Sequence, residues 1–182
     1  VDYVRVYESN DTFGCTDPNA SNYNSAATIS DNESCSYDVT FNVNMNCSDE
    51  NPNTVYVNGN FNNWCGNCLP LSDDNNDGIW TGTYSFAQST IEYKYSYDNW
   101  TGSENLIDDM QNGANCAPAT DYNEYANRQL VIDSELTINE NYGSCDDCIA
   151  GCTDPSSANY NSDANYDDGS CGGTDCDLSV VN

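Results

Sequence analysis

The amino-acid sequence predicts an all-β fold, more specifically an immunoglobulin-like β-sandwich stapled by disulfides. Apolar and polar residues alternate in about six or seven short segments between positions 37 and 148, and no segment has the period of an amphipathic helix. Clusters of Asn, Asp and Gly separate these segments, as turns require. Eleven cysteines at wide spacings add a disulfide framework.

The first alternating segment shows the pattern clearly. In VTFNVNM, at positions 39–45, Val39, Phe41 and Val43 fall on one face of a strand, and the polar residues between them fall on the other. The remaining predicted strands alternate in the same way. They are 54–59, 79–86, 91–97, 128–133 and 136–139.

Two similar segments bounded by cysteines flank this region. Gly14–Cys35 and Gly151–Cys171 share GCTDP at the start, NYNS in the middle and SC at the end. Each is too short for a hydrophobic core, so we expect one internal disulfide per repeat, Cys15–Cys35 and Cys152–Cys171. Closing a loop of about 20 residues stabilises it by roughly 3 kcal/mol.

Six further cysteines lie in the sandwich region, and we expect them to form three more disulfides. Two C-x-x-C pairs would also suit a four-thiolate zinc site, but the other cysteines favour disulfides. Six cysteines allow fifteen connectivities, and we expect one cysteine of the first C-x-x-C pair to join one of the second. The odd Cys176 is then free or bonded to sequence beyond this chain. The six are Cys47, Cys65, Cys68, Cys116, Cys145 and Cys148.

These patterns divide the chain into five parts. In order, they are the end of a preceding domain with a linker at 1–13, the first repeat at 14–36, the sandwich at 37–148, the second repeat at 149–171 and a linker at 172–182. Residues 1–8 alternate like a strand, which belongs either to the edge of the sandwich or to a preceding domain. With no initiator Met and no signal peptide, the chain is expected to be a piece of a longer secreted or cell-surface protein.

The composition excludes several classes of function. Lys and Arg number 3 against 30 Asp and Glu, a formal net charge of −27, so neither nucleic acid nor an anionic membrane is an expected partner. No stretch approaches the ~20 apolar residues of a membrane span. The chain has no histidine, nucleophile elbow, phosphate-binding loop or dinucleotide fingerprint, and no carboxylate pair stands out, so catalysis is not expected.

Two tryptophans occur in polar loop sequence. Trp64 ends NGNFNNW, and Trp100 follows YDN. A pyranose presents axial C–H groups on one face and hydroxyls at its edge, so its binding site needs a flat apolar platform rimmed by amides or charges. A loop indole among asparagines suits that need, although it also suits a lid over a small core. Trp80 is in phase with Tyr84 and Phe86 and is predicted to be a core residue.

The segments VYVNGNFNNW, LPLSDDNNDGIWTGTYSF, IEYKYSYDNW and NRQLVI, within 55–132, resemble glycogen- and starch-binding modules related to the AMP-activated kinase β-subunit and the starch-branching enzymes. The resemblance implies that Trp64 and Trp100 stack on sugar rings, while Lys94 and Asn127 hydrogen-bond hydroxyls. As alternatives, the lysine pairs with an acidic side chain across strands and the asparagine caps a turn. Tyr97 and Tyr125 are further candidates.

The chain departs from this family pattern in three places. CGNC lengthens the loop after Trp64, the Gly of the D-G-x-W motif is missing before Trp100, and a long segment with Cys116 precedes Asn127. We therefore rank α-glucan third among the expected ligands. A neutral glycan suits a chain with so few cations. A β-glucan such as laminarin ranks first and an agarose-type galactan second, because VDYVRVYE at residues 1–8 resembles a strand of the family 16 glycoside hydrolases, which attack β-linked glucans and galactans.

Two shorter resemblances concern the ends of the chain. The repeats resemble the GCTDP…DDGSC repeats of secreted proteins from marine Bacteroidetes, where they are spacers. Residues 1–8, VDYVRVYE, resemble the C-terminal strand of the catalytic domain in glycoside hydrolase family 16, whose catalytic glutamates lie on a strand absent here. This implies a covalently linked catalytic domain and a non-catalytic module beside it.

Clustered oxygen ligands suggest calcium as a cofactor. Asp73, Asn75 and Asp77 match the start of a calcium-binding loop, although an EF-hand would need Glu where Tyr84 stands. The same residues form Asx turns without metal. We expect at least one calcium site, in the repeats rather than at 73–77. The repeat candidates are Asp17, Asp154 and Asp168.

The sequence thus predicts a monomeric, polysaccharide-binding module with no organic cofactor. The alternative is a structural spacer or cell-surface stalk that binds no ligand.

Overall fold

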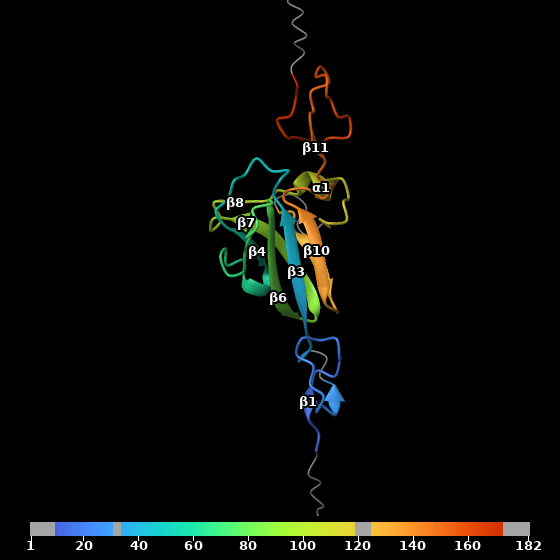
Figure 1. Ribbon diagram of the computed structural model, residues 1–182. Helices are drawn as coiled ribbons and strands as arrows, with labels where there is room; N and C mark the ends of the chain where they lie inside the picture. Colours follow the sequence, from blue (N-terminus) through green and yellow to red (C-terminus); the bar gives the residue numbers. More distant parts are fainter. Residues whose placement is uncertain (1–9, 31–33, 119–124, 173–182) are drawn as a thin grey trace, which may run out of the picture.

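The computed structural model describes residues 10–30, 34–118 and 125–172, which form a nearly all-β molecule (Figure 1). The predicted β-sandwich is confirmed, and the two repeats extend from its opposite ends. Residues 1–8 and Cys176 lie outside the described ranges. No helix within these ranges has the length and apolar character to cross a membrane.

The elements follow one another along the chain with short connections. They are β1 (Phe13–Gly14), β2 (Ile29–Ser30), β3 (Ser36–Asn44), β4 (Val55–Gly59), the 3-10 helix η2 (Asn60–Asn62), β5 (Pro70–Leu71), β6 (Ile79–Ala87), β7 (Ser89–Tyr97), β8 (Gly102–Ser103), α1 (Ile107–Gln111), β9 (Arg128–Ile132), β10 (Leu136–Asn141), β11 (Ala150–Gly151) and β12 (Tyr166–Asp167).

Two sheets form the layers of the sandwich. The first has the order β10-β3-β6, with β3 antiparallel to β6 and parallel to β10. The second has five strands in the order β5-β4-β7-β8, and β9 also pairs with β7. Each repeat contains one short parallel pair, β1 with β2 and β11 with β12.

The alternation in the sequence decides which side chains enter the core. Phe41 of β3 is fully buried and packs edge-to-face against Phe86 of β6 and Tyr93 of β7, with ring centroids 5.9 and 5.5 Å apart. Such aromatic pairs contribute beyond their buried area. Trp80, predicted as a core residue, packs partly buried against this cluster.

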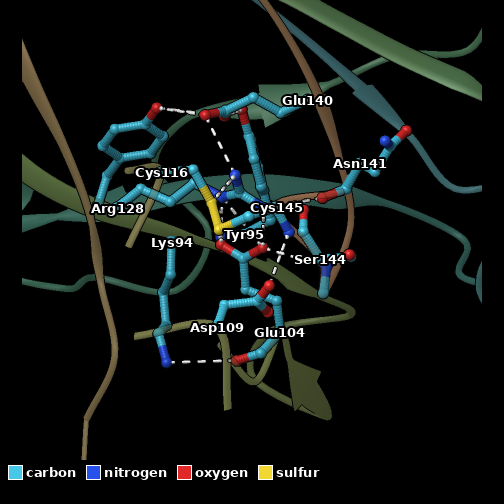
Figure 2. A network of polar contacts seen from close by, with 12 residues as sticks. Lys94, Tyr95, Glu104, Asp109, Cys116, Arg128, Glu140, Asn141, Ser144 and Cys145 are labelled. Atoms are coloured by element: carbon cyan, nitrogen blue, oxygen red, sulfur yellow. Dashed lines mark hydrogen bonds and ion pairs between the residues drawn. A yellow bond between two sulfur atoms is a disulfide. The ribbon is translucent and has the colours of Figure 1, made fainter. Parts of the chain in front are cut away.

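A buried ion-pair network surrounds Arg128, and the sequence does not predict it (Figure 2). The guanidinium is 1% exposed and contacts Glu104 through Nη2 at 2.8 Å and Glu140 through Nη1 at 3.2 Å. Tyr95 donates its hydroxyl to Glu140 at 2.6 Å. Burial alone would lower the pKa of Arg128, but the two carboxylates raise it, so the guanidinium stays charged.

Hydrogen bonds with backbone groups satisfy further polar atoms of this network. Glu104 accepts the backbone N–H of Tyr95 at 2.9 Å and of Gly143 at 3.2 Å. Arg128 also donates to the backbone oxygen of Asn141 at 2.8 Å. The buried charges therefore hold β7, β9 and the end of β10 together, and a buried charge that loses its partner is strongly destabilising.

Five disulfides staple the described residues, which is typical of an extracellular protein. Two of them close the repeats as expected, at Cys15–Cys35 and Cys152–Cys171. The expected link between the two C-x-x-C pairs is wrong. The bonds are Cys65–Cys68, Cys47–Cys148 and Cys116–Cys145.

The topology explains the correct pairing of the sandwich cysteines. Cys65 and Cys68 lie in the loop that covers the outer side of the five-stranded sheet. Cys148 instead follows β10, and Cys47 follows β3, the strand that pairs with β10. The register that places Asn44 opposite Asn141 brings these two cysteines together.

Candidate functional site

A cavity of about 790 Å³ opens on the outer side of the five-stranded sheet. Trp64, Lys94, Trp100, Tyr125 and Asn127 all line it, so five of the six residues predicted for ligand binding come together. They come from the loop after β4, from β7, from the turn after β7 and from the residues before β9. Segments far apart in the sequence thus build one site.

Strand β7 supplies the charged floor of the cavity. Because successive strand residues point to opposite faces, Glu92 and Lys94 face the cavity while Tyr93 and Tyr95 fill the core. The Lys94 Nζ donates to the backbone oxygen of Glu104 at 3.4 Å (Figure 2). Burial lowers the pKa of Lys94 below its usual 10.5, and the charge of Glu104 partly offsets this.

Lys94 does not form the cross-strand ion pair that was the alternative prediction for it. Both ion pairs in the described part of the chain belong to Arg128. The ammonium group therefore faces the cavity with hydrogen-bonding capacity remaining, since it carries three donors.

Asn127 and Tyr125 form the wall next to β9. Asn127 is 8% exposed, and its Nδ2 lies 3.5 Å from an oxygen of Glu92, at the limit of hydrogen bonding. Tyr125 is 58% exposed. The first offers a buried amide to a ligand and the second an accessible ring.

Trp100 occupies a tight left-handed turn after β7. Asp98, Asn99 and Trp100 have φ of 46, 56 and 65°, a region that costs about 1–2 kcal/mol for each non-glycine residue. The Asp98 carboxylate offsets this cost by accepting the backbone N–H of Asn53 at 3.1 Å and of Thr54 at 3.0 Å. Strain of this kind clusters at functional sites.

The loop after β4 holds the indole of Trp100 in place. Trp100 donates its Nε1 proton to the backbone oxygen of Trp64 at 3.2 Å. Its ring packs on Gly66, where an added Cβ would lie 2.4 Å from Cδ1. The fully buried Asn58 accepts the Gly66 N–H at 2.7 Å and donates to the Ser96 hydroxyl at 2.7 Å. A chain of contacts therefore runs from β7 to the indole of Trp100.

Neither indole in the cavity belongs to the hydrophobic core. Trp100 is 39% exposed and Trp64 is half-buried, whereas Trp80 packs against the core. Trp100 is therefore not a lid over the core. Its ring packs on Gly66 and lines the cavity.

Tyr97 is the one ligand-binding candidate outside the cavity. It shares the strand face of Tyr93 and Tyr95, because odd positions of β7 all point away from Lys94. Its hydroxyl donates to Glu50 at 2.6 Å and its ring contacts that of Tyr142.

The cavity also contains residues that sequence reasoning missed. Glu92 could have been found, because it lies two positions before Lys94 on the same face of a predicted strand. Four more lie at the end of β8 or just after it, where the sequence does not alternate, and they enter the cavity because β8 pairs with the end of β7. They are Ser103, Glu104, Asn105 and Ile107.

The calcium candidate at 73–77 is engaged in turn hydrogen bonds. Asp73 accepts the backbone N–H of Asp77 at 3.0 Å and of Gly78 at 2.9 Å. Asn75 donates to the Asp77 carboxylate at 2.8 Å. These bonds are those of an Asx-type turn, which forms without metal.

The repeat candidates form similar turns. The backbone N–H of Asn19 and of Ser156 lowers the pKa of Asp17 and of Asp154, and hydrogen bonds from Ser170 lower that of Asp168. Within the described ranges no three Asp, Glu or Cys side chains gather as a metal site. Calcium binding would therefore depend on amide and backbone oxygens besides these carboxylates.

Comparisons with known proteins give limited information on this chain. No family model matches it. No curated protein matches it.

Among solved structures, a glycoside hydrolase family 15 glucoamylase from Hypocrea jecorina matches with a TM-score of 0.39 and 23% identity, over 60% of this chain and 17% of that one. The glucoamylase of Hormoconis resinae matches with a TM-score of 0.39 and 19% identity, over 64% of this chain and 19% of that one. This chain thus spans less than a fifth of either enzyme. At these values neither glucoamylase defines the fold or the function of this chain.

Proposed function

We propose that this chain is a non-catalytic module that binds polysaccharide in the cavity lined by Trp64 and Trp100. The observation that carries the proposal is the meeting of two loop indoles, an exposed tyrosine, a lysine and a buried amide around one cavity. Flat apolar rings suit the C–H face of a pyranose, and the amide and ammonium groups suit its hydroxyls.

The two carboxylates of the cavity support binding rather than hydrolysis. Glycoside hydrolysis needs a pair of carboxyl groups on either side of the scissile bond. Glu104 is held by Arg128 and by two backbone N–H groups, and it is 2% exposed. Among the described residues that line the cavity, Glu92 is the carboxylate that remains for contact with a ligand.

Charge favours a neutral glycan. The chain carries a net charge of −27, and Lys94 stands beside Glu92 in the cavity, so a polyanion finds no cluster of cations there. At the ionic strength of seawater the Debye length falls to about 4 Å, which relieves distant repulsion without supplying contact partners. We rank β-glucan such as laminarin first, agarose-type galactan second and α-glucan third.

The module is proposed to act outside the cell, secreted or at the cell surface, as a monomer linked to a glycoside hydrolase catalytic domain. The disulfides fit an oxidising setting. The linked enzyme rests on the resemblance of residues 1–8 alone. Even modest affinity of the module would then keep the linked enzyme near its substrate, because the link raises the effective concentration of substrate at the catalytic domain.

A pull-down against a panel of insoluble and gel-forming glycans tests the proposal. Trp64→Ala and Trp100→Ala should each weaken binding by roughly 1–3 kcal/mol, as hot-spot anchors do, with the fold intact. Phe13→Ala removes a 66% exposed aromatic ring outside the cavity and should leave binding unchanged.

Two outcomes would contradict the proposal. Absence of binding to every glycan would favour the spacer alternative. Tight calcium-independent binding to alginate or carrageenan, unaffected by either tryptophan substitution, would show that both ligand and site are wrong.

A further inference from the structure

The outer face of the three-stranded sheet carries a regular uncharged array. The register of β10, β3 and β6 aligns two successive rows of side chains, and neither row contains a charge. We name these six residues the amide face. They are Asn139, Asn42 and Thr81 in one row and Asn141, Asn44 and Ile79 in the next.

A cleft of about 360 Å³ lies on the amide face. Ile79, 39% exposed, gives it one apolar wall. Glu140 and Asp147 are the acidic residues that line it. The Glu140 carboxylate is occupied by Arg128 and by the hydroxyls of two core tyrosines, so Asp147 is the remaining charge at the rim.

Hydrogen bonds along the rows hold the amides in fixed orientations. Asn42 donates to Asn139 at 3.0 Å and accepts from the Thr81 hydroxyl at 2.9 Å, and Asn44 donates to Asn141 at 3.1 Å. An amide has two donor protons and two acceptor lone pairs. Asn44 also accepts two hydrogen bonds from Asn46, and Asn141 donates to the backbone oxygen of Asp146 at 2.7 Å. Asn42 and Asn139 therefore keep the most outward capacity, on groups that are already ordered, which lowers the entropic cost of binding.

We propose that the amide face binds a second strand of neutral polysaccharide, separate from the strand in the indole cavity. Ordered amides match the paired donors and acceptors of neighbouring sugar hydroxyls, and Ile79 matches a C–H surface. This inference rests on the proposed function, since it assigns the same class of ligand to a new surface.

The charge of the molecule favours a neutral polysaccharide on the amide face over a polyanion or a second copy of the chain. A polyanion would approach a chain of net charge −27 and find no cation on the amide face. A second copy would bring its own 30 acidic residues with only 3 Lys and Arg to pair them, so contact is unfavourable even where salt screens the distant repulsion. A neutral polyhydroxylated chain meets neither obstacle.

The two surfaces lie on the outer sides of the two sheets, because Lys94 and Asn42 both point away from the shared core. One short oligosaccharide therefore cannot occupy both. The module gains the capacity to bridge two polysaccharide strands.

Three double variants separate the surfaces. Trp64→Ala with Trp100→Ala disables the cavity. Ile79→Asp with Asn139→Asp places two charges on the amide face, and the second change keeps the oxygen that accepts from Asn42.

Val131→Asp with Asn51→Asp is the matched control, since it adds the same charges at exposed positions outside both surfaces. Each variant qualifies when it melts in one cooperative transition well above the temperature of the titration. Calorimetric titration with short laminarin oligosaccharides, and in parallel with agarose oligosaccharides, gives the stoichiometry. Light scattering with long-chain laminarin reports bridging.

The wild type and the control should bind two oligosaccharides per module and raise the scattering. The cavity variant should keep one site, weaker than the cavity site because the amide face has no aromatic ring, and the face variant should keep only the stronger site. Neither should raise the scattering.

Each contrary result has its own meaning. Loss of all binding in the cavity variant overturns the amide-face site and leaves the proposed function intact. A wild type that binds neither oligosaccharide, and no glycan of the pull-down panel, refutes the proposed function itself. Scattering that the wild type shows without glycan, and that the face variant loses, would make the occupant a second copy and overturn the inference.

Discussion

Gly66→Ala is expected to disable the cavity by displacing Trp100 while the sandwich stays folded. The new Cβ would lie 2.4 Å from Cδ1 and 2.6 Å from Nε1 of the indole. Ordinary carbon contacts are about 3.5–4.0 Å, so the ring must retreat by about 1 Å or more. That retreat breaks the 3.2 Å hydrogen bond from Trp100 to the backbone of Trp64.

The magnitude follows from two separate costs. Loss of a hot-spot platform weakens binding by roughly 1–3 kcal/mol, which is about 5- to 150-fold in affinity. Gly66 also has a φ of 87°, and an alanine in the left-handed region costs about 1–2 kcal/mol of stability. Binding to laminarin is measured by calorimetry, and stability by thermal melting.

Gly113→Ala is the matched control for backbone strain. Gly113 has a φ of 78°, and an added Cβ would meet nothing within 4 Å. It should lower the melting temperature through backbone strain alone, by no more than Gly66→Ala does, and leave affinity unchanged. Equal affinities for wild type, Gly66→Ala and Gly113→Ala would refute the claim that the position of Trp100 matters.

Three further predictions concern charge, the buried network and metal. Glycan affinity should fall as pH rises through the pKa of Lys94, which burial places below 10.5, because the ammonium loses its charge. In a plot of glycan affinity against pH, measured from about pH 7 to about pH 11 by depletion of the protein from solution onto insoluble glycan, Lys94→Arg should flatten the curve. A flat curve for the wild type would count against a role for this charge. Arg128→Leu should lower the free energy of unfolding in urea by about 3–5 kcal/mol, since it leaves two buried carboxylates without their cation, and a loss below about 1 kcal/mol would contradict the account of the network. Excess chelator should lower the melting temperature by several degrees if a repeat binds calcium, whereas an unchanged curve would leave the Asx turns as a sufficient explanation.

Sequence pattern predicted the sandwich because its strands alternate with period two and its turns are rich in Asn, Asp and Gly. The same alternation placed Lys94 away from the core, and loop composition singled out Trp64 and Trp100. These features are local, so the sequence alone contains them.

Features that depend on pairing between distant segments could not be predicted in this way. Glu104 meets Arg128 only because β9 pairs with β7, and Cys47 meets Cys148 only because β10 runs parallel to β3. The Cys65–Cys68 bond depends on a loop that folds over Asn58. Tyr97 was chosen by type, and its strand phase would have excluded it.

The most direct test of the central claim is a heteronuclear NMR titration with laminarin oligosaccharides. The chain has 3 tryptophans, so three indole N–H signals can be assigned by single substitution. The signals of Trp64 and Trp100 should shift together with saturation, while that of the core residue Trp80 stays in place. Saturable binding that moves neither cavity indole would contradict the site, and no shift with any neutral glycan would contradict the function.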